Sequence, residues 1–475
     1  MSFRSQIVRG FGWTAGSRLL SQIFTWTVTI VVMRILSPGD YGLLAMATVL
    51  VTFLSLFAEL GVGGAIVQTR DVDLKTMRSV LGMVVLVNFA LFMLTVLIAP
   101  LIASFYGQNQ LTLICQVIAL QFLIGALAVL PDAQLQRKLE FKWRSIIDLT
   151  AVLVQSVTTL VLALNGFGVW SLVLSSLTGA LWRVAGLNIL SPFPHFPSFE
   201  FKGLGKFLSF GGYVLVARIL GNVSNQADTV IGGRVLGQEQ IGYYSVGMDL
   251  ASLPMQRVAA IMNTVAFPAV ASIQDEQGRI ADYLVRGMRL LNLLTFPVFW
   301  GIASVAPELI RLLLGSKWEP AIVPLQLLAL IVPVRMIWQI MPPILLGMGK
   351  ARLVAWNHVV LLIGMVSSFC VGVQYGLLGL STAWLLMFPV VFLINFKTWL
   401  NVLNLQPRDF VMTVKTPAIA AAGMSASIAV ARFLDFGGNL SAFLALITVG
   451  ASSYLALVWI LDRAALQQFR AIFRA

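Results

Sequence analysis

Apolar runs long enough to cross a lipid bilayer follow one another along almost the whole chain, separated by short polar stretches. A transmembrane helix needs about 20 mainly apolar residues. Of the 475 residues, 59% are hydrophobic and 11% are charged, and the mean hydropathy is +0.90. Soluble domains carry about 25% charged residues, and disordered chains combine low hydrophobicity with high net charge. The sequence therefore predicts an all-α, polytopic integral membrane protein.

The runs predict about fourteen transmembrane helices. Their approximate limits are 11–33, 42–66, 79–104, 111–130, 146–164, 168–190, 209–233, 244–270, 288–314, 321–346, 352–373, 376–400, 411–432 and 439–461. The formal net charge is +13, and most Lys and Arg residues fall in alternate loops and in both tails, as in cytoplasmic segments. We therefore expect both termini in the cytoplasm. This pattern explains the positive charge without a nucleic-acid partner, for which no exposed domain is predicted.

The two halves of the sequence are related. A shift of 200 residues places Arg18 on Arg218 and Gly42 on Gly242 without a gap. An even number of spans in each half makes the repeats parallel, with a pseudo-twofold axis along the membrane normal. The predicted organisation is a six-helix N-terminal lobe, an interfacial linker, a six-helix C-terminal lobe and a C-terminal helix pair, over residues 1–190, 191–206, 207–401 and 402–475. Three prolines exclude a regular helix from the linker, which we expect to lie in the cytoplasmic interface.

Polar side chains inside the spans indicate a binding site, because they are costly in lipid unless they face a cavity or a partner. The first span places three on one helical face, and the seventh places three at equivalent positions: Arg18, Gln22 and Thr25, and Arg218, Asn222 and Asn225. Across a pseudo-twofold axis, these two stripes would line a hydrated cavity. Arginine suits bidentate contact with phosphate, and amides and hydroxyls suit sugar hydroxyls.

Other intramembrane charges leave two interpretations open. Arg257 and Arg335 are further candidates for substrate binding, although either side chain could extend to an interface instead. Glu59 and Asp228 could form structural ion pairs with the arginines, or Asp228 could bind a coupling proton or cation. The two His residues are too scattered for a metal site. We expect no catalytic constellation and no cofactor, and the sequence leaves a coupling ion, H⁺ or Na⁺, undetermined.

Two short motifs carry a resemblance to a known family. The opening Gly10-Phe11-Gly12-Trp13 and the turn from Arg34 to Gly42, which reads RILSPGDYG, resemble the polysaccharide transporter, or oligosaccharide flippase, family of the multidrug/oligosaccharidyl-lipid/polysaccharide (MOP) flippase superfamily. The similarity extends over essentially the whole chain. It is strongest to the colanic-acid and exopolysaccharide type, sometimes labelled lipopolysaccharide biosynthesis proteins.

The resemblance implies a flippase that moves undecaprenyl-pyrophosphate-linked oligosaccharide repeat units to the periplasmic leaflet of the bacterial inner membrane. It implies alternating access between the two lobes, in exopolysaccharide, O-antigen or capsule biosynthesis. By this resemblance, Arg18 and Arg218 would hold the pyrophosphate, and Gln22, Asn222 and Asn225 the sugars. The implied partners are membrane lipids, a polysaccharide polymerase and a chain-length regulator.

Two alternatives remain at this stage. A MATE-like, ion-coupled drug exporter of the same superfamily would favour acidic residues in the cavity of the first lobe, where only Glu59 qualifies. A membrane polysaccharide polymerase or ligase would need a long extracytoplasmic loop for its catalytic residues. The predicted outward loops, such as 104–110 and 165–169, are too short for that role, so we expect a transporter and not an enzyme.

Overall fold

The computed structural model describes residues 16, 21–22, 24–58, 74–138, 140–193, 196–200, 212–272, 277–434 and 438–463, and every regular element in these ranges is helical. Within them, nine helices are long and apolar enough to cross a membrane, or ten if the bent segment formed by Gln110–Ala126 and Val129–Arg137 is one span. The prediction of an all-helical, polytopic membrane protein is confirmed.

The contacts of the chain divide it into two compact units, which are described separately. Unit 1 comprises Met1–Gly212 and Gly237–Gly242, and unit 2 comprises Tyr213–Leu236 and Tyr243–Ala475. The segment 402–475, expected as a separate helix pair, falls within unit 2.

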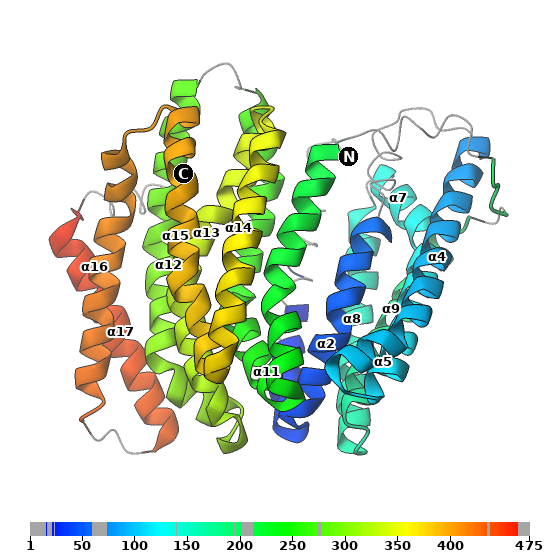
Figure 1. Cartoon of the computed structure of the whole chain (residues 1–475), viewed down its shortest axis with the longest axis horizontal. Coiled ribbons are helices and arrows are strands. Elements are labelled where there is room, and N and C mark those ends of the chain that lie inside the picture. The colour runs from blue at the N-terminus through cyan, green and yellow to red at the C-terminus, as the bar shows by residue number, and fades with distance from the viewer. Residues whose placement is uncertain are drawn as a thin grey trace. The chain divides into compact units, whose positions relative to one another are not determined.

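Unit 1 is a bundle of helices (Figure 1). Its principal helices are α2 (Pro38–Ala58), α4 (Leu74–Tyr106), α5 (Gln110–Ile118), α6 (Leu120–Ala126), α7 (Val129–Arg137), α8 (Phe141–Leu164) and α9 (Val169–Leu190). The chain bends by 41° between α6 and α7. In the first turn of α7, Asp132 accepts hydrogen bonds of 2.6 and 3.1 Å from Arg144 of α8, which joins these helices by a bidentate ion pair.

The RILSPGDYG turn starts α2 and also caps α9. Ser37 precedes Pro38, the first residue of α2, and the Ser37 Oγ accepts from the Asp40 N–H at 3.2 Å while Asp40 Oδ2 accepts from the Ser37 N–H at 2.9 Å. This reciprocal arrangement is a capping box with proline at the first helical position. Asp40 Oδ1 also accepts from the Val169 N–H at 2.8 Å. One carboxylate therefore stabilises the amino termini of two helices.

The same turn packs against its counterpart in the second half of the sequence. A Cβ atom on Gly42 would lie 1.7 Å from the carbonyl oxygen of Gln238, and a Cβ atom on Gly242 would lie 1.8 Å from the carbonyl oxygen of Pro38. Both contacts lie within unit 1, and they exchange under the 200-residue shift. Backbone approaches this close require glycine at both positions.

The part of the interfacial linker that the structure describes is held along α4. The Ser198 N–H donates to the carbonyl oxygen of Arg78 at 2.9 Å, and Arg78 Nε donates to the carbonyl oxygen of Phe196 at 3.0 Å. Gly82 leaves room for the chain, because a Cβ atom there would lie 2.0 Å from the Ser198 carbonyl oxygen. Residues 192–193 and 196–200 are not helical, as the prolines predict.

Unit 2 is also built of helices (Figure 1). They are α11 (Gly212–Ser272), α12 (Gln277–Leu313), α13 (Ile322–Gly347), α14 (Ala351–Gly372), α15 (Gly376–Leu403), α16 (Pro407–Ala431) and α17 (Asn439–Leu461), with short 3₁₀ turns η1 (Ser316–Ala321) and η2 (Val373–Tyr375). We expected a loop between residues 233 and 244, but the helical structure of α11 is interrupted there only at Gly237, with φ of 81°. A single left-handed residue, which glycine adopts readily, is enough to redirect the chain.

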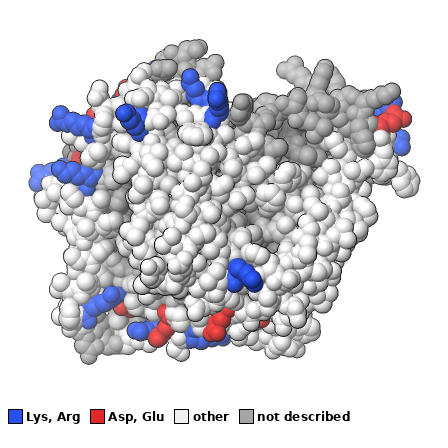
Figure 2. Space-filling model, in the orientation of Figure 1, with Lys and Arg blue, Asp and Glu red and all other residues white. Residues whose placement is uncertain are grey.

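The last two helices pack along α12. Asn292 donates to the Thr413 carbonyl oxygen at 3.2 Å, Ser304 Oγ to Ser425 Oγ at 2.9 Å, and Arg432 to both carboxylate oxygens of Glu308 at 2.9 and 2.8 Å. The nearly constant sequence separation of these pairs shows that α12 and α16 run parallel. Figure 2 shows that the charged side chains of unit 2 gather mainly near the helix ends, with a broad uncharged band between them.

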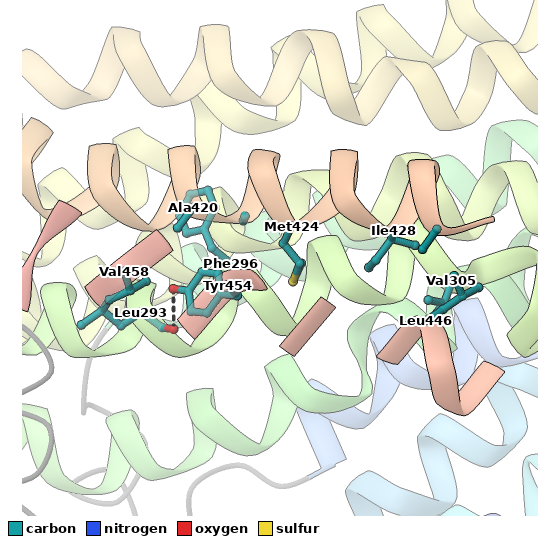
Figure 3. Packing of buried hydrophobic residues seen from close by; sticks show 11 residues of the cluster. Leu293, Phe296, Val305, Ala420, Met424, Ile428, Leu446, Tyr454 and Val458 are labelled. Carbon is teal, nitrogen blue, oxygen red and sulfur yellow. Dashed lines mark hydrogen bonds between the residues drawn. The ribbon is translucent and has the colours of Figure 1, made fainter. Parts of the chain in front are cut away.

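The antiparallel helix α17 completes this packing. Arg289, near the start of α12, forms an ion pair with Asp462 just after α17. The Tyr454 hydroxyl donates to the Leu293 carbonyl oxygen at 2.9 Å, as the dashed line in Figure 3 shows. The three helices enclose a core of buried residues that includes Phe296, Met424 and Ile428.

Candidate functional site

The polar stripe predicted on the seventh span lies on α11. Arg218 and Asn225 are exposed, whereas Asn222 is partly buried. Within the described residues, Arg218 forms no ion pair with Asp228, so that structural pairing is not observed. The Oδ1 atom of Asn222 is buried without a hydrogen-bond partner. An unsatisfied buried acceptor is costly, so this position suits a ligand or water donor.

The other predicted positions are described only in part. Gln22 and Thr25 are partly buried. Arg18 and Glu59 lie outside the described residues, as does the side chain of Arg257. Their predicted roles therefore stay predictions.

Asp228 lies at the centre of a buried polar cluster in unit 2, and its side chain is 1% exposed. Its Oδ2 atom accepts from the Tyr244 hydroxyl at 2.7 Å and from Trp384 Nε1 at 3.0 Å. Its Oδ1 atom accepts from the Thr229 N–H at 2.6 Å and from the Thr229 hydroxyl at 3.2 Å. A carboxylate offers about four acceptor positions, so neutral donors satisfy Asp228 completely.

Arg335 lies beside the same indole ring and is 7% exposed. Its guanidinium carbon is 4.1 Å from the centre of the Trp384 ring, in a cation–π contact. Its Nη1 donates to the weak acceptor Sδ of Met248 at 3.5 Å. Among the residues that the structure describes, no carboxylate forms an ion pair with Arg335. The structure thus brings Asp228 and Arg335 to one cluster but keeps them unpaired.

Tyr244 and Trp384 were not singled out from the sequence. Both are fully buried and lie among the largest side chains of the core. The chain contains 12 Trp and 8 Tyr residues, and aromatic residues in apolar helices usually pack in the core. Only their contacts with Asp228 and Arg335 distinguish these two residues from the others.

An apolar groove lies on a different side of unit 2, among α12, α16 and α17. Its volume is about 490 Å³, and its wall includes Pro297, Gly301, Ile428, Gly450 and Leu455. Figure 3 shows the side chains of Met424, Ile428 and Tyr454 in this region. The one hydroxyl in the wall, that of Tyr454, already donates to a backbone carbonyl. The groove therefore suits a hydrocarbon chain and offers nothing to a polar ligand.

The chemistry available in unit 2 is thus anion binding and hydrocarbon binding. Within the described ranges, no group of three or more His, Cys, Asp or Glu side chains could hold a metal ion. The donors at hand are a buried guanidinium in Arg335, an exposed guanidinium in Arg218 and the amide of Asn225. Such groups bind phosphate and sugar oxygens.

Comparisons with known proteins find relatives that align with nearly the whole chain. The chain is 26% identical over 451 residues to the teichuronic acid biosynthesis protein TuaB of Bacillus subtilis strain 168, covering 93% of this chain and 90% of that protein. It is 27% identical over 487 residues to the succinoglycan biosynthesis transport protein ExoT of Rhizobium meliloti strain 1021, covering 99% and 96%.

Two solved structures share the fold. The lipid II flippase MurJ in an inward closed conformation superposes with a TM-score of 0.77 at 15% identity, covering 95% of this chain and 99% of that one. An inward-facing multidrug resistance MATE family transporter of the MOP superfamily superposes with a TM-score of 0.62 at 14% identity, covering 80% and 95%. At these identities the likeness concerns the fold alone.

The family itself is established by sequence. The profile of the polysaccharide biosynthesis protein family matches residues 31–323, which is more than half of the chain and includes α2 to α12. With its helical, multi-pass architecture, the chain belongs to the polysaccharide biosynthesis protein family and has the fold of the MOP flippase superfamily.

Proposed function

We propose that this protein is a flippase for polyprenyl-pyrophosphate-linked oligosaccharides, moving undecaprenyl-linked repeat units from the cytoplasmic to the periplasmic leaflet. One observation carries the proposal: Arg335 is buried in membrane helices without an ion pair among the described residues. A charge in such a position is costly, and a bound anion would offset that cost. The pyrophosphate of a lipid-linked sugar is such an anion.

The apolar groove supports a lipid-linked substrate. It is lined by hydrocarbon side chains and by small residues such as Gly301 and Ala451, so it fits a prenyl chain better than a sugar. Arg335 and Arg218 would contact the pyrophosphate, and Asn222 and Asn225 the sugars. In unit 1, Arg18 would contact the pyrophosphate, Gln22 the sugars, and Thr25 is a further predicted contact.

The proposed topology has fourteen transmembrane helices with both termini in the cytoplasm. Nine candidate spans become ten when α14 and α15 are counted separately, and eleven with the bent α5–α7 segment. The two parts of α11 on either side of Gly237 and the short helix Phe24–Ile35 bring the number to fourteen. Two six-helix lobes would alternate access, and α16 and α17 would move with unit 2, to which the ion pairs of Arg432 and Arg289 join them.

We also propose an energy source for transport and two protein partners. An ion gradient or the membrane potential would drive transport, with H⁺ or Na⁺ as the coupling ion. A polysaccharide polymerase would consume the flipped repeat unit, and a chain-length regulator would act with it. The relatives named for succinoglycan transport and teichuronic acid biosynthesis support a transport role in polysaccharide biosynthesis.

The test measures lipid-linked oligosaccharide by leaflet in cells that lack this protein and any redundant flippase. We expect complete repeat units to accumulate on the cytoplasmic face and wild-type protein to relieve the accumulation. Arg218→Gln combined with Arg335→Gln should not relieve it at equal expression. Arg286→Gln is the matched control, because Arg286 is an exposed arginine of α12 outside the cluster. Normal outward presentation without the protein would refute the proposal.

A further inference from the structure

Two aromatic residues of the cluster, Tyr244 and Trp384, donate hydrogen bonds to Asp228. We propose that Trp384 and Tyr244 are positioning residues: by occupying the carboxylate of Asp228, they keep Arg335 out of an ion pair and leave its donors available for the phosphate groups of the substrate. This inference rests on the proposed function and assigns roles to two residues of that site.

The carboxylate of Asp228 is occupied by donors other than arginine. Arginine and a buried carboxylate normally form a short, bidentate ion pair, and such a pair would neutralise Arg335. Here Tyr244 and Trp384 donate to Oδ2 of Asp228, and both donors also lie 2.9 Å from each other. These two aromatic side chains fill the acceptor positions that an arginine would otherwise take.

The guanidinium of Arg335 stacks on the ring of Trp384. Trp384 presents its N–H edge to Asp228 and its ring face to Arg335. A guanidinium that stacks on a ring has its N–H donors in its own plane, directed away from the ring face. The stack stabilises the buried cation and consumes none of its five donors. Among the described residues, only the contact with Met248 uses one of these donors.

Trp384 contacts both charged side chains of the cluster. The same indole separates a saturated carboxylate from an unpaired guanidinium, although Asp228 and Arg335 are close enough to interact electrostatically. Removal of the indole N–H would free one acceptor position of Oδ2, and the guanidinium of Arg335 contacts the same indole ring. Asp228 would then capture Arg335, and the site would lose its anion-binding capacity without losing its charge.

The experiment measures binding of geranylgeranyl pyrophosphate, with geranylgeraniol as the neutral control, to the purified full-length protein. We expect Trp384→Phe, which keeps an aromatic ring but lacks the donor, to bind the pyrophosphate about tenfold more weakly, which is about 1.4 kcal/mol. Tyr244→Phe leaves the Arg335–Trp384 stack in place and should also weaken binding. Trp338→Phe is the matched control, because Trp338 is a buried tryptophan of α13 in aromatic contacts with Phe388 and Trp399.

The decisive variant combines Trp384→Phe with Asp228→Asn. The amide cannot form an ion pair with Arg335, and its NH₂ group can donate to the Tyr244 oxygen, so the double variant should regain most of the lost affinity. A merely structural cluster would make the second substitution additive or worse. If the double variant binds as weakly as Trp384→Phe, or if Trp384→Phe binds like wild type, the positioning role is wrong.

The outcomes also separate this inference from the proposed function. Wild-type protein that binds geranylgeranyl pyrophosphate no better than geranylgeraniol would overturn both. Wild-type protein that prefers the pyrophosphate through Arg335, while Trp384→Phe and Tyr244→Phe keep the same preference, would overturn the positioning role alone.

Discussion

Asp40 offers a stability prediction that can be worked out from the geometry. Its carboxylate accepts from Ser37 at the start of α2 and from the Val169 N–H at the start of α9. Asp40→Asn keeps one acceptor oxygen, but its NH₂ group must then face one of these donors. Loss of one helix cap costs about 1 kcal/mol. Loss of the negative charge at two helix amino termini costs about 0.3–1 kcal/mol each, so we expect a loss of about 2 kcal/mol.

The assay is the half-life of monodisperse protein in detergent at a fixed temperature, because large membrane proteins unfold irreversibly. If the bridge is broken in the transition state for unfolding, 2 kcal/mol accelerates inactivation up to about 30-fold. Asp409→Asn is the matched control. Asp409 lies in the first turn of α16, and its carboxylate accepts no hydrogen bond from the residues that the structure describes.

Gly168 provides a second arm for the same prediction. Its φ is 53°, and a Cβ atom there would lie 3.0 Å from Asp40 Oδ1. Gly168→Ala should therefore also shorten the half-life, and its effect should be smaller in the Asp40→Asn background, because the contact it disturbs is already weakened. An Asp40→Asn protein that decays no faster than Asp409→Asn would show that the Asp40 carboxylate does not stabilise the two helix amino termini.

Three further predictions follow from unit 2 and the linker. Gly301→Leu should fill the groove, since a Cβ atom there meets only Met424 at 3.7 Å, and should therefore weaken geranylgeraniol binding severalfold. Gly287→Leu on the same helix is the control. Equal binding by both variants would argue against the groove as a hydrocarbon site. Arg289→Gln and Asp462→Asn should each destabilise the partly buried contact between α12 and α17, with a coupling of about 1 kcal/mol in a double-mutant cycle of inactivation rates; additive effects would contradict it. The hydrogen bond from Lys75 lowers the pKa of Glu200. The contribution of this pair to holding the linker along α4 is therefore present above the ordinary carboxyl pKa and is lost as the pH falls through the lowered pKa. Carbon-13 titration of Glu200 should show a higher pKa in Lys75→Met, and an unchanged value would exclude the pair.

The sequence predicted the helical membrane fold well because hydropathy and span length depend on local composition. The run expected at 79–104 is α4, Leu74–Tyr106, and the run expected at 439–461 is α17. The polar stretch between 234 and 243 lowers the hydropathy there, so the sequence predicts a loop at the position of the break in α11. Hydropathy does not reveal that the helix continues on both sides of Gly237.

The site was predictable only for residues whose chemistry is unusual in a membrane. Arg335 and Asp228 stand out as intramembrane charges, and the structure places both around one indole. The role of Trp384 was not visible, because its contacts with Asp228 join residues 156 positions apart. Likewise, no local pattern indicates that Asp40 reaches Val169, although the RILSPGDYG turn itself was recognisable.

We propose that Arg335, which forms no ion pair with a carboxylate among the described residues, binds the pyrophosphate of a lipid-linked oligosaccharide during its passage through this protein. The direct measurement is transbilayer movement of a fluorescent polyprenyl-pyrophosphate oligosaccharide in proteoliposomes, with the matching neutral polyprenyl oligosaccharide as control. We predict that wild-type protein moves the pyrophosphate lipid and not the neutral one, and that Arg335→Gln abolishes this preference at equal reconstitution. Equal movement of both lipids by wild-type protein, or unchanged selectivity in Arg335→Gln, would contradict the claim.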